Sequence, residues 1–143
     1  MADAALIAQY NVALAKESEN LTLEPAVVRK GVLAVLSDPA KGIYFVVDDG
    51  PQMVGQLLVT YEWSDWRNGN FWWLQSVYVH PEFRSRGVFQ SLFDHVLEQA
   101  KNAPQTCGFR LYVEAHNNRA KAVYDRLSFK DTEYQLLERL FVC

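Results

Sequence analysis

The fold is decided by one stretch, Val77–Gln90, which reads Val-Tyr-Val-His-Pro-Glu-Phe-Arg-Ser-Arg-Gly-Val-Phe-Gln. Its apolar start predicts the end of a strand, and the apolar residues after Gly87 recur with the period of a helix. The first N–H groups of a helix have no intrahelical partner and carry partial positive charge. Gly87 lets a ligand approach the backbone, and Arg84 and Arg86 add charge. The stretch therefore predicts an anion-binding site between a strand and a helix.

The same turn also has an interpretation without a ligand. Arginines in an exposed turn often serve only to keep a protein soluble. The stretch holds no Gly-Lys-Ser/Thr, so it is not the phosphate loop of a nucleotide-hydrolysing enzyme. Local physics alone supports the anion site and the plain solvated turn about equally.

The composition fits one folded domain over residues 1–143, of which half are hydrophobic and 22% are charged. A net charge of -3 argues against a nucleic-acid-binding protein. Cys107 and Cys143 make no disulfide framework, and no zinc-like spacing occurs, so we expect a cytoplasmic protein without a metal. No apolar run is long enough for a membrane span, and no signal-peptide pattern is present, which predicts no membrane association.

Hydrophobic periodicity and turn signals predict the order α-α-β-β-β-α-β-α-β, a mixed α/β layout with hairpins and crossovers. Asp3 is a candidate cap for the first helix, and Pro25 suits the first turn of the second. The helix that begins at Gly87 has the clearest apolar stripe. The predicted helices span about 4–18, 25–37, 87–102 and 118–127, and the strands 43–47, 54–62, 71–80, 109–115 and 134–142.

The turn resembles the first signature of the GNAT superfamily of N-acetyltransferases, Arg/Gln-x-x-Gly-x-Gly/Ala between a strand and a helix. Arg84 and Gly87 match its first two fixed positions, and Phe89 departs from the third. In the helical pattern Phe89 points into the core while the backbone N–H groups face the phosphates. We therefore expect cofactor binding to persist, with a shifted pyrophosphate.

A second motif, one predicted strand later, resembles the family's Asn-x-x-Ala-x-x-x-Tyr-x-x-x-Gly-Phe. It is matched by Asn117, Ala120, Tyr124 and Phe129, with Ser128 in place of the glycine. The two motifs stand in the family's order and spacing, and the resemblance covers residues 42–141. The family usually begins with a strand before the first helix; here that strand is predicted to be absent or short.

The resemblance implies an acyl-CoA N-acyltransferase fold in which helices flank both faces of a central, mostly antiparallel sheet. It also implies that acetyl-CoA, as cosubstrate, lies in the cleft between the strand that ends at Val79 and the strand 109–115. The cofactor-binding residues would be Val77, Tyr78, Val79, Arg84, Ser85, Arg86, Gly87, Val88, Phe89, Gln90, Asn117, Ala120 and Tyr124.

Tyr124 is the first candidate for catalysis. The resemblance implies that its phenol donates a proton or a hydrogen bond to the leaving thiolate. On periodicity alone it is a core residue of an apolar helix stripe. The main-chain N–H of Val79 is the candidate for polarising the thioester carbonyl. Asn117 either contacts the pantetheine or caps the helix that follows.

The attacking amine must lose a proton, so a general base is expected. Glu62 and Glu114 are the candidates because both lie near predicted strand ends, and Asp65, in a turn, is weaker. Each is more often an ordinary surface carboxylate. Trp72 and Trp73 face opposite sides of their strand, so at least one lies outside a single core face and either lines an acceptor pocket or packs elsewhere.

The resulting expectation is an enzyme that moves acetyl from acetyl-CoA to a primary amine, by direct attack on the thioester. The aromatic hairpin around Trp72 favours a small-molecule acceptor in a confined pocket. The alternative is a CoA-binding sensor or partner module without turnover, which the departures at Phe89 and Ser128 favour. A homodimer is also possible, because dimers are common in the family.

Overall fold

The computed structural model describes residues 2–142, which fall into two compact units divided after Tyr112. The second unit holds α4 (Asn118–Arg126) and a C-terminal segment without helix or strand. The first unit holds α1 (Ala4–Glu19), α2 (Pro25–Ser37), β1 (Ile43–Asp49), β2 (Gln52–Ser64), β3 (Gly69–Val79), a short 3-10 helix η1 (Pro81–Phe83), α3 (Val88–Asn102) and β4 (Thr106–Leu111).

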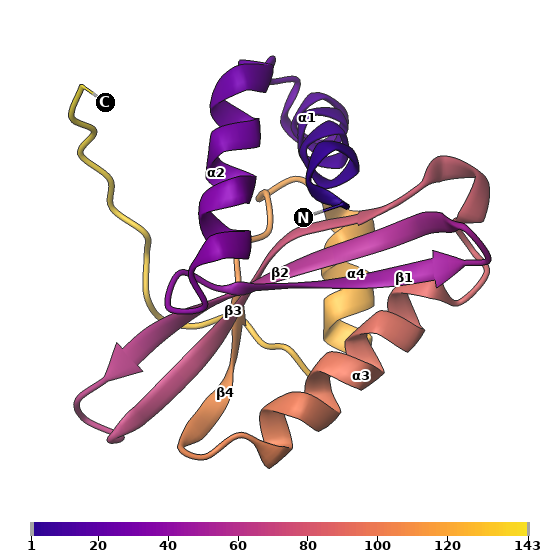
Figure 1. Ribbon diagram of the computed structural model, residues 1–143. Coiled ribbons are helices and arrows are strands. Elements are labelled where there is room, and N and C mark those ends of the chain that lie inside the picture. Colours follow the sequence, from indigo (N-terminus) through magenta and orange to yellow (C-terminus); the bar gives the residue numbers. More distant parts are fainter. Residues whose placement is uncertain (1, 143) are drawn as a thin grey trace. The chain divides into compact units, whose positions relative to one another are not determined.

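The first unit is built on an open sheet of four strands in the order β1-β2-β3-β4 (Figure 1). Two hairpins join β1 to β2 and β2 to β3 in antiparallel pairs, and β4 returns parallel to β3 after the crossover through α3. The prediction of a mixed, mostly antiparallel sheet is therefore confirmed. No strand precedes α1 among the described residues.

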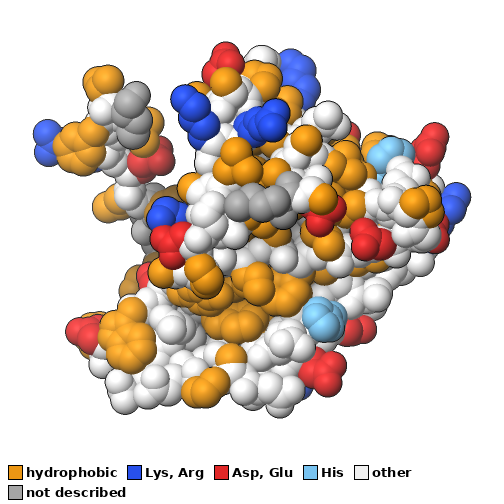
Figure 2. All heavy atoms as spheres, in the orientation of Figure 1, with side chains coloured by type: hydrophobic (Ala, Val, Ile, Leu, Met, Phe, Trp, Pro, Cys, Tyr) orange, Lys and Arg blue, Asp and Glu red, His pale blue; other side chains and the backbone are white. Residues whose placement is uncertain are grey.

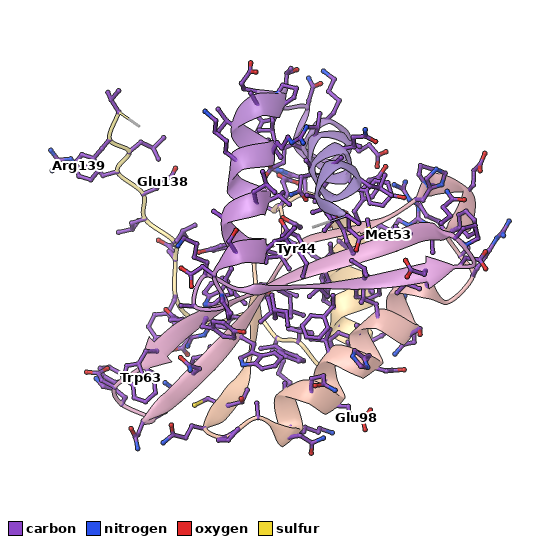
Figure 3. The ribbon with its side chains drawn as sticks, in the orientation of Figure 1. Tyr44, Met53, Trp63, Glu98, Glu138 and Arg139 are labelled. Carbon is purple, nitrogen blue, oxygen red and sulfur yellow. The ribbon has the colours of Figure 1, made fainter. Side chains whose placement is uncertain are left out.

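Helices cover both faces of this sheet. α1 and α2 lie on one face, and α3 lies on the other (Figure 1). Under α1 and α2, the Tyr10 ring lies 5.0 Å from that of Tyr78, and its hydroxyl donates to the Met53 carbonyl at 2.6 Å. Figure 3 labels Tyr44 and Met53 on this part of the sheet. On the other face, the Phe93 ring of α3 packs 5.7 Å from the ring of Phe109.

Three sequence predictions need correction. Asp3 precedes α1, but its side chain makes no capping hydrogen bond; its backbone carbonyl accepts from Ile7 N–H instead. β4 begins and ends earlier than predicted, because the register pairs Asn70 with Thr106 and ends where Leu74 pairs with Leu111. A tertiary pairing, rather than the run of apolar residues, defines its bounds.

The last predicted strand, 134–142, is also wrong. The described part of this segment has no strand pairing, and its large apolar side chains are exposed. A strand needs an edge to pair with, whereas an alternating sequence only makes such pairing favourable. Among the described helices, none is both long and apolar enough to cross a membrane.

Candidate functional site

The site begins where β3 and β4 part. Their last paired residues are Leu74 and Leu111, yet β3 continues beside β2 as far as Val79. The His80 N–H donates to the Val54 carbonyl at 2.8 Å, and residues alternate in direction along an antiparallel ladder. The main-chain groups of Val79 therefore point away from β2, toward the edge that β4 has left open.

A bulge re-aims this end of β3. The register shifts between Gln56 and Leu58 of β2, and Ser76 on β3 has φ of 51°. The buried Gln56 amide donates to Asn11 Oδ1 of α1 at 2.7 Å and to the Ser76 carbonyl at 3.3 Å. The bulge is thus tied to α1, and beyond it Tyr78 turns toward that helix.

Arg84 fixes the turn that follows β3. Its Nε donates to the Val79 carbonyl at 2.9 Å, and its Nη2 pairs with Glu17 of α1 at 2.8 Å. Its guanidinium also lies 5.3 Å from the centre of the Tyr78 ring. The sequence predicts Arg84 as charge for an anion, whereas here its side chain holds the strand end against α1.

The start of α3 is open. Gly87 has φ of 79° and provides no capping side chain, and a Cβ added there would meet nothing within 4 Å. The first backbone bond of the helix is donated by Ser91 to the Gly87 carbonyl, so the preceding N–H groups of the first turn point out of the helix end. Arg86 lies beside this end, over the Phe83 ring. These are the elements of an anion site.

The residues after Gly87 pack on the body of the helix. The Phe89 ring lies 6.1 Å from the ring of Phe93, one turn further along the core-facing stripe. Val88 lies so near Gly55 that a Cβ there would come within 2.9 Å of its methyl group. Gln90 donates to Asp94 at 2.8 Å. The bulk of Phe89 therefore lies along α3, not at the helix end.

Glu62 lies in an aromatic and ionic cluster on the sheet. Its Oε1 pairs with Arg110 Nη1 at 2.6 Å and accepts from the Trp73 indole at 3.2 Å. The Arg110 guanidinium lies 3.7 Å from the centre of the Phe71 ring, and the ring centres of Trp73 and Tyr112 are 4.5 Å apart. Trp72 is buried on the opposite face against Phe109, so the prediction that the two tryptophans diverge is confirmed.

The second unit carries the other predicted residues. Asn117 caps α4, since its Oδ1 accepts from the Ala120 N–H at 3.1 Å. Tyr124 lies one turn beyond Ala120, with its ring 5.6 Å from that of Phe129, and burial raises the pKa of its phenol. Ser128 has φ of 70°, which explains why the second motif usually has glycine at this position.

Glu114 is not at a strand end, because β4 already stops at Leu111. It lies in the turn before α4, where its carboxylate accepts from the His116 N–H at 2.8 Å and pairs with the His116 ring. The hydrogen bonds from His116 lower the pKa of Glu114. A carboxylate with a lowered pKa is a weaker base, which reduces its fitness for proton removal.

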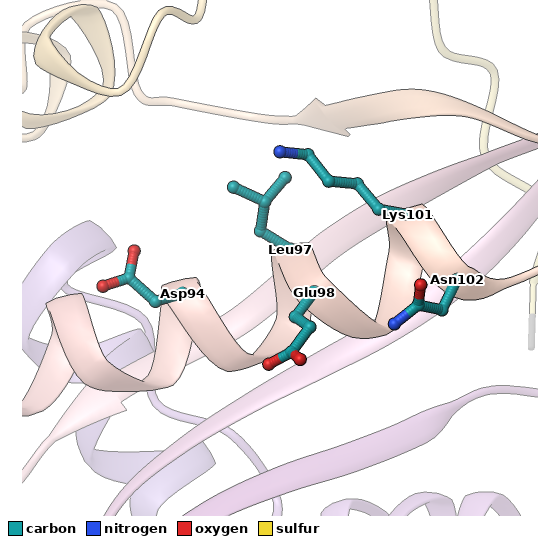
Figure 4. Close-up of a pocket in the computed structure, with 5 residues that line it drawn as sticks. All are labelled: Asp94, Leu97, Glu98, Lys101 and Asn102. Atoms are coloured by element: carbon teal, nitrogen blue, oxygen red, sulfur yellow. The ribbon is translucent and has the colours of Figure 1, made fainter.

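A separate hollow of about 360 Å³ lies along α3, lined by Asp94, Leu97, Glu98, Lys101 and Asn102 (Figure 4). Its residues follow the first turn of the helix and carry both signs of charge. It is therefore distinct from the open helix end at Gly87.

Three residues of the site escape prediction from sequence. Glu17, Gln56 and Arg110 belong to no motif and act only through partners far along the chain: Arg84, Ser76 and Glu62. An amphipathic helix predicts Glu17 as a solvent-exposed residue, and no local pattern marks it as a partner of the turn.

The sheet opens along one edge of β3, and β3 is followed by the uncapped start of α3. This mixed α/β protein therefore has a site that suits an extended anionic ligand. The family model "Acetyltransferase (GNAT) family" matches residues 8–129. The chain therefore belongs to the GNAT acetyltransferase family, as the two motifs predict.

The relatives agree with this assignment. A solved structure of a possible acetyltransferase from Clostridium difficile 630 is 43% identical, with a TM-score of 0.94 over 100% of this chain and 94% of that one. A predicted acetyltransferase from Clostridium acetobutylicum, solved with acetyl-CoA, is 14% identical with a TM-score of 0.79, over 97% of this chain and 91% of that one, and shows the shared fold.

A curated relative is the thialysine N-epsilon-acetyltransferase of Bos taurus, 32% identical over 102 residues. The match covers 70% of this chain and 54% of the relative, so the chain spans about half the length of that protein.

Proposed function

We propose that this chain transfers an acetyl group from acetyl-CoA to a small-molecule primary amine by direct attack of the amine on the thioester. The observation that carries the proposal is the continuous path from the open edge of β3, beyond Leu74, to the uncapped start of α3 at Gly87. An extended ligand with amide groups at one end and phosphates at the other matches this path.

The described residues fit acetyl-CoA by two features. The main chain near Val79 faces an open edge, where the amides of a pantetheine arm can pair as an added strand does. The helix end at Gly87 has open space at the Cβ position and outward N–H groups, which suits a pyrophosphate. When bound, the thioester supplies an activated acetyl group with a thiolate as leaving group.

Two groups of the chain would stabilise the acyl transfer, one at the thioester carbonyl and one at the sulfur. The Val79 N–H polarises the carbonyl that the amine attacks, because it lies on the strand edge next to the bulge. The Tyr124 phenol protonates the sulfur as the carbon–sulfur bond breaks. Burial raises the pKa of Tyr124, so the phenol keeps its proton at neutral pH and can donate it.

Glu62 is proposed to attract the protonated amine by its charge and not to act as the direct base, because it pairs with Phe71, eight residues along β3 from Val79. Glu62 also lies beside the aromatic rings of Trp73 and Phe71, and aromatic faces attract a cationic amine before it is deprotonated. A small amine suits such a cluster because a few side chains can surround it.

The test of the reaction follows thiol release from acetyl-CoA with a panel of amines. The panel contains lysine, thialysine, polyamines and free amino acids, because the Bos taurus relative is named for acetylation of an ε-amine. We expect release well above background for at least one small amine, together with a product heavier by one acetyl group. Acetyl-CoA binding without release for any amine would instead support a non-catalytic module.

The test of this role compares Glu62→Gln with Asp65→Asn, a neighbouring exposed carboxylate in the turn after β2. We expect Glu62→Gln to raise the KM for the amine by about tenfold and to leave kcat close to that of the parent protein. Asp65→Asn should leave both close to the parent protein. Equal effects of the two substitutions would remove Glu62 from this role.

A further inference from the structure

The last turn of α1 carries a carboxylate that the helix itself does not favour. Glu17 lies where the carbonyl dipoles make the helix end negative, so an acidic side chain there is electrostatically unfavourable. Figure 2 shows hydrophobic side chains gathered over the sheet, with charged side chains mostly around them. Such charges are ordinarily solvated and need no protein partner. Glu17 differs, because two side chains from a distant part of the chain bind it.

Both partners of Glu17 come from the end of β3 and the turn after it. The Tyr78 hydroxyl donates to Glu17 Oε1 at 3.2 Å, and Arg84 Nη2 pairs with Glu17 Oε2 at 2.8 Å. Tyr78 keeps its proton for this bond, since burial and the nearby Glu17 charge raise the pKa of its phenol. Each oxygen of the carboxylate therefore accepts its own hydrogen bond, which fixes the position of the Glu17 side chain.

The Arg84 guanidinium connects this carboxylate to the main chain of β3. Its Nε donates to the Val79 carbonyl at 2.9 Å while its Nη2 is bound to Glu17, so one planar group joins helix and strand. The guanidinium lies 5.3 Å from the centre of the Tyr78 ring, and that ring lies 5.0 Å from the ring of Tyr10 on α1. The donor to the Val79 carbonyl is thus held by contacts on α1 and β3.

The Val79 carbonyl and the Val79 N–H lie on the same edge of β3. The His80 N–H donates to the Val54 carbonyl of β2, so the main-chain groups of Val79 point to the side that β4 has left open. Arg84 binds the carbonyl, and an extended ligand on this edge would meet the neighbouring N–H. A rotation of the strand end would turn both groups together. The direction of that N–H therefore depends on Arg84, and through Arg84 on Glu17.

We propose that Glu17 is a positioning residue for the acyl transfer, which acts through Arg84 to hold the Val79 N–H toward the thioester carbonyl. The inference rests on the proposed function, in which this N–H polarises that carbonyl. A donor of this kind is effective because it is held in place before the reaction, so a small displacement lowers the rate more than it weakens binding. The whole contact lies within the first unit.

The first test separates turnover from cofactor affinity in Glu17→Ala. We expect kcat to fall by about tenfold and the Kd for acetyl-CoA to stay within about twofold of the parent value. Glu17→Gln should recover most of kcat, because an amide oxygen can still accept from Arg84. Glu19→Ala removes an exposed carboxylate from the same helix turn and is the matched control. A parent-like kcat in Glu17→Ala would overturn the proposal.

A melting curve of each variant excludes a purely structural effect. The side chains of Arg84 and Glu17 are 41% and 43% exposed, and ion pairs as exposed as this contribute little to stability. We therefore expect the melting temperatures of Glu17→Ala and Glu19→Ala to lie close together. A large drop for Glu17→Ala alone would assign the residue to stability and reject the positioning role.

The second test asks whether Glu17 acts through Arg84. Arg84→Ala should lower kcat at least as much as Glu17→Ala does, because it also removes the donor to the Val79 carbonyl. Adding Glu17→Ala to Arg84→Ala should then change kcat no further, since residues that act in series are not additive. Additive losses in the double variant would contradict a route through Arg84.

The third test needs no acetyl transfer. Hydrogen exchange of the His80 amide, followed by NMR without ligand, reports how firmly the end of β3 is held on β2. We expect exchange about tenfold faster in Glu17→Ala and unchanged in Glu19→Ala. Parent-like exchange in Glu17→Ala would overturn the positioning of the strand end. Faster exchange in a chain that acetylates no amine would support this positioning and reject the proposed reaction instead.

Discussion

The starts of α3 and α4 differ in a way that separates the two sequence motifs. α3 begins at Gly87, which has a left-handed backbone and no capping side chain. α4 begins at Asn117, whose side chain accepts from the Ala120 N–H. The start of α3 keeps its N–H groups directed outward. At the start of α4, by contrast, one N–H group is hydrogen-bonded to the capping side chain.

The contrast indicates that the two motifs have different tasks. An open end with Arg86 beside it can bind an anion. A closed end gives α4 a firm start, from which Tyr124 is held on the body of the helix. We therefore expect substitutions near Gly87 to act on cofactor affinity and substitutions on α4 to act on turnover or stability.

The largest effect is expected for Tyr124→Phe. Loss of the phenolic proton should lower kcat by about 10²-fold, whereas the affinity for acetyl-CoA changes little. Steady-state kinetics and calorimetric titration with acetyl-CoA measure the two quantities. Tyr134→Phe, on the exposed C-terminal segment, is the control and should leave kcat unchanged. A parent-like kcat for Tyr124→Phe would assign this tyrosine to packing alone.

Gly87→Glu should weaken acetyl-CoA binding by about tenfold, since it places a negative charge where the helix end is positive. Gly50→Glu is the matched control, because Gly50 also has positive φ and open space at Cβ but lies in the hairpin between β1 and β2. Both changes strain the backbone, and only the first should affect binding. Equal affinities of the two variants would mean that the cofactor binds elsewhere.

Asn117→Ala should cost about 1 kcal/mol of stability, because it removes the side-chain cap of α4. Chemical denaturation measures the change. Asn117→Asp should retain most of the stability, since a carboxylate can accept the same hydrogen bond. If Asn117→Ala instead reduced acetyl-CoA affinity at unchanged stability, Asn117 would contact the cofactor and the contrast between the helix starts would fail.

Ser128→Gly should stabilise the chain by about 1 kcal/mol, because φ of 70° strains any residue with a Cβ. Ser37→Gly, at the end of α2, should have the opposite sign, since glycine weakens a helix. Thermal melting of both variants provides the comparison. A loss of stability for Ser128→Gly would show that the serine side chain contributes more than the strain costs.

The smallest effect is expected from the turn before α4. Hydrogen bonds from His116 lower the pKa of Glu114 below its ordinary value in the folded chain. Its contribution to stability is therefore present above the ordinary value and is lost as the pH falls through the lowered one. Melting temperatures on the acidic side should fall slightly less steeply for Glu114→Gln than for the parent chain. Identical slopes would contradict the role of this pair.

Sequence periodicity predicted the helices closely and the sheet only in part. The apolar stripe of α3 and the proline at the start of α2 mark their elements because helix signals are local. β4 was displaced by several residues, because its bounds depend on its register with β3. The segment 134–142 has a strand-like pattern but no partner among the described residues, so the pattern alone could not make it a strand.

The sequence by itself determined the family, the order of the helices and of the first four strands, and the open helix end at Gly87. These follow from local spacing, which the chain carries without reference to distant residues. Only the tertiary structure decided that Arg84 is bound by Glu17 and that Glu62 is paired with Arg110. Both pairs join residues far apart in the chain. The first depends on how α1 packs on the sheet, and the second depends on how β4 pairs with β3.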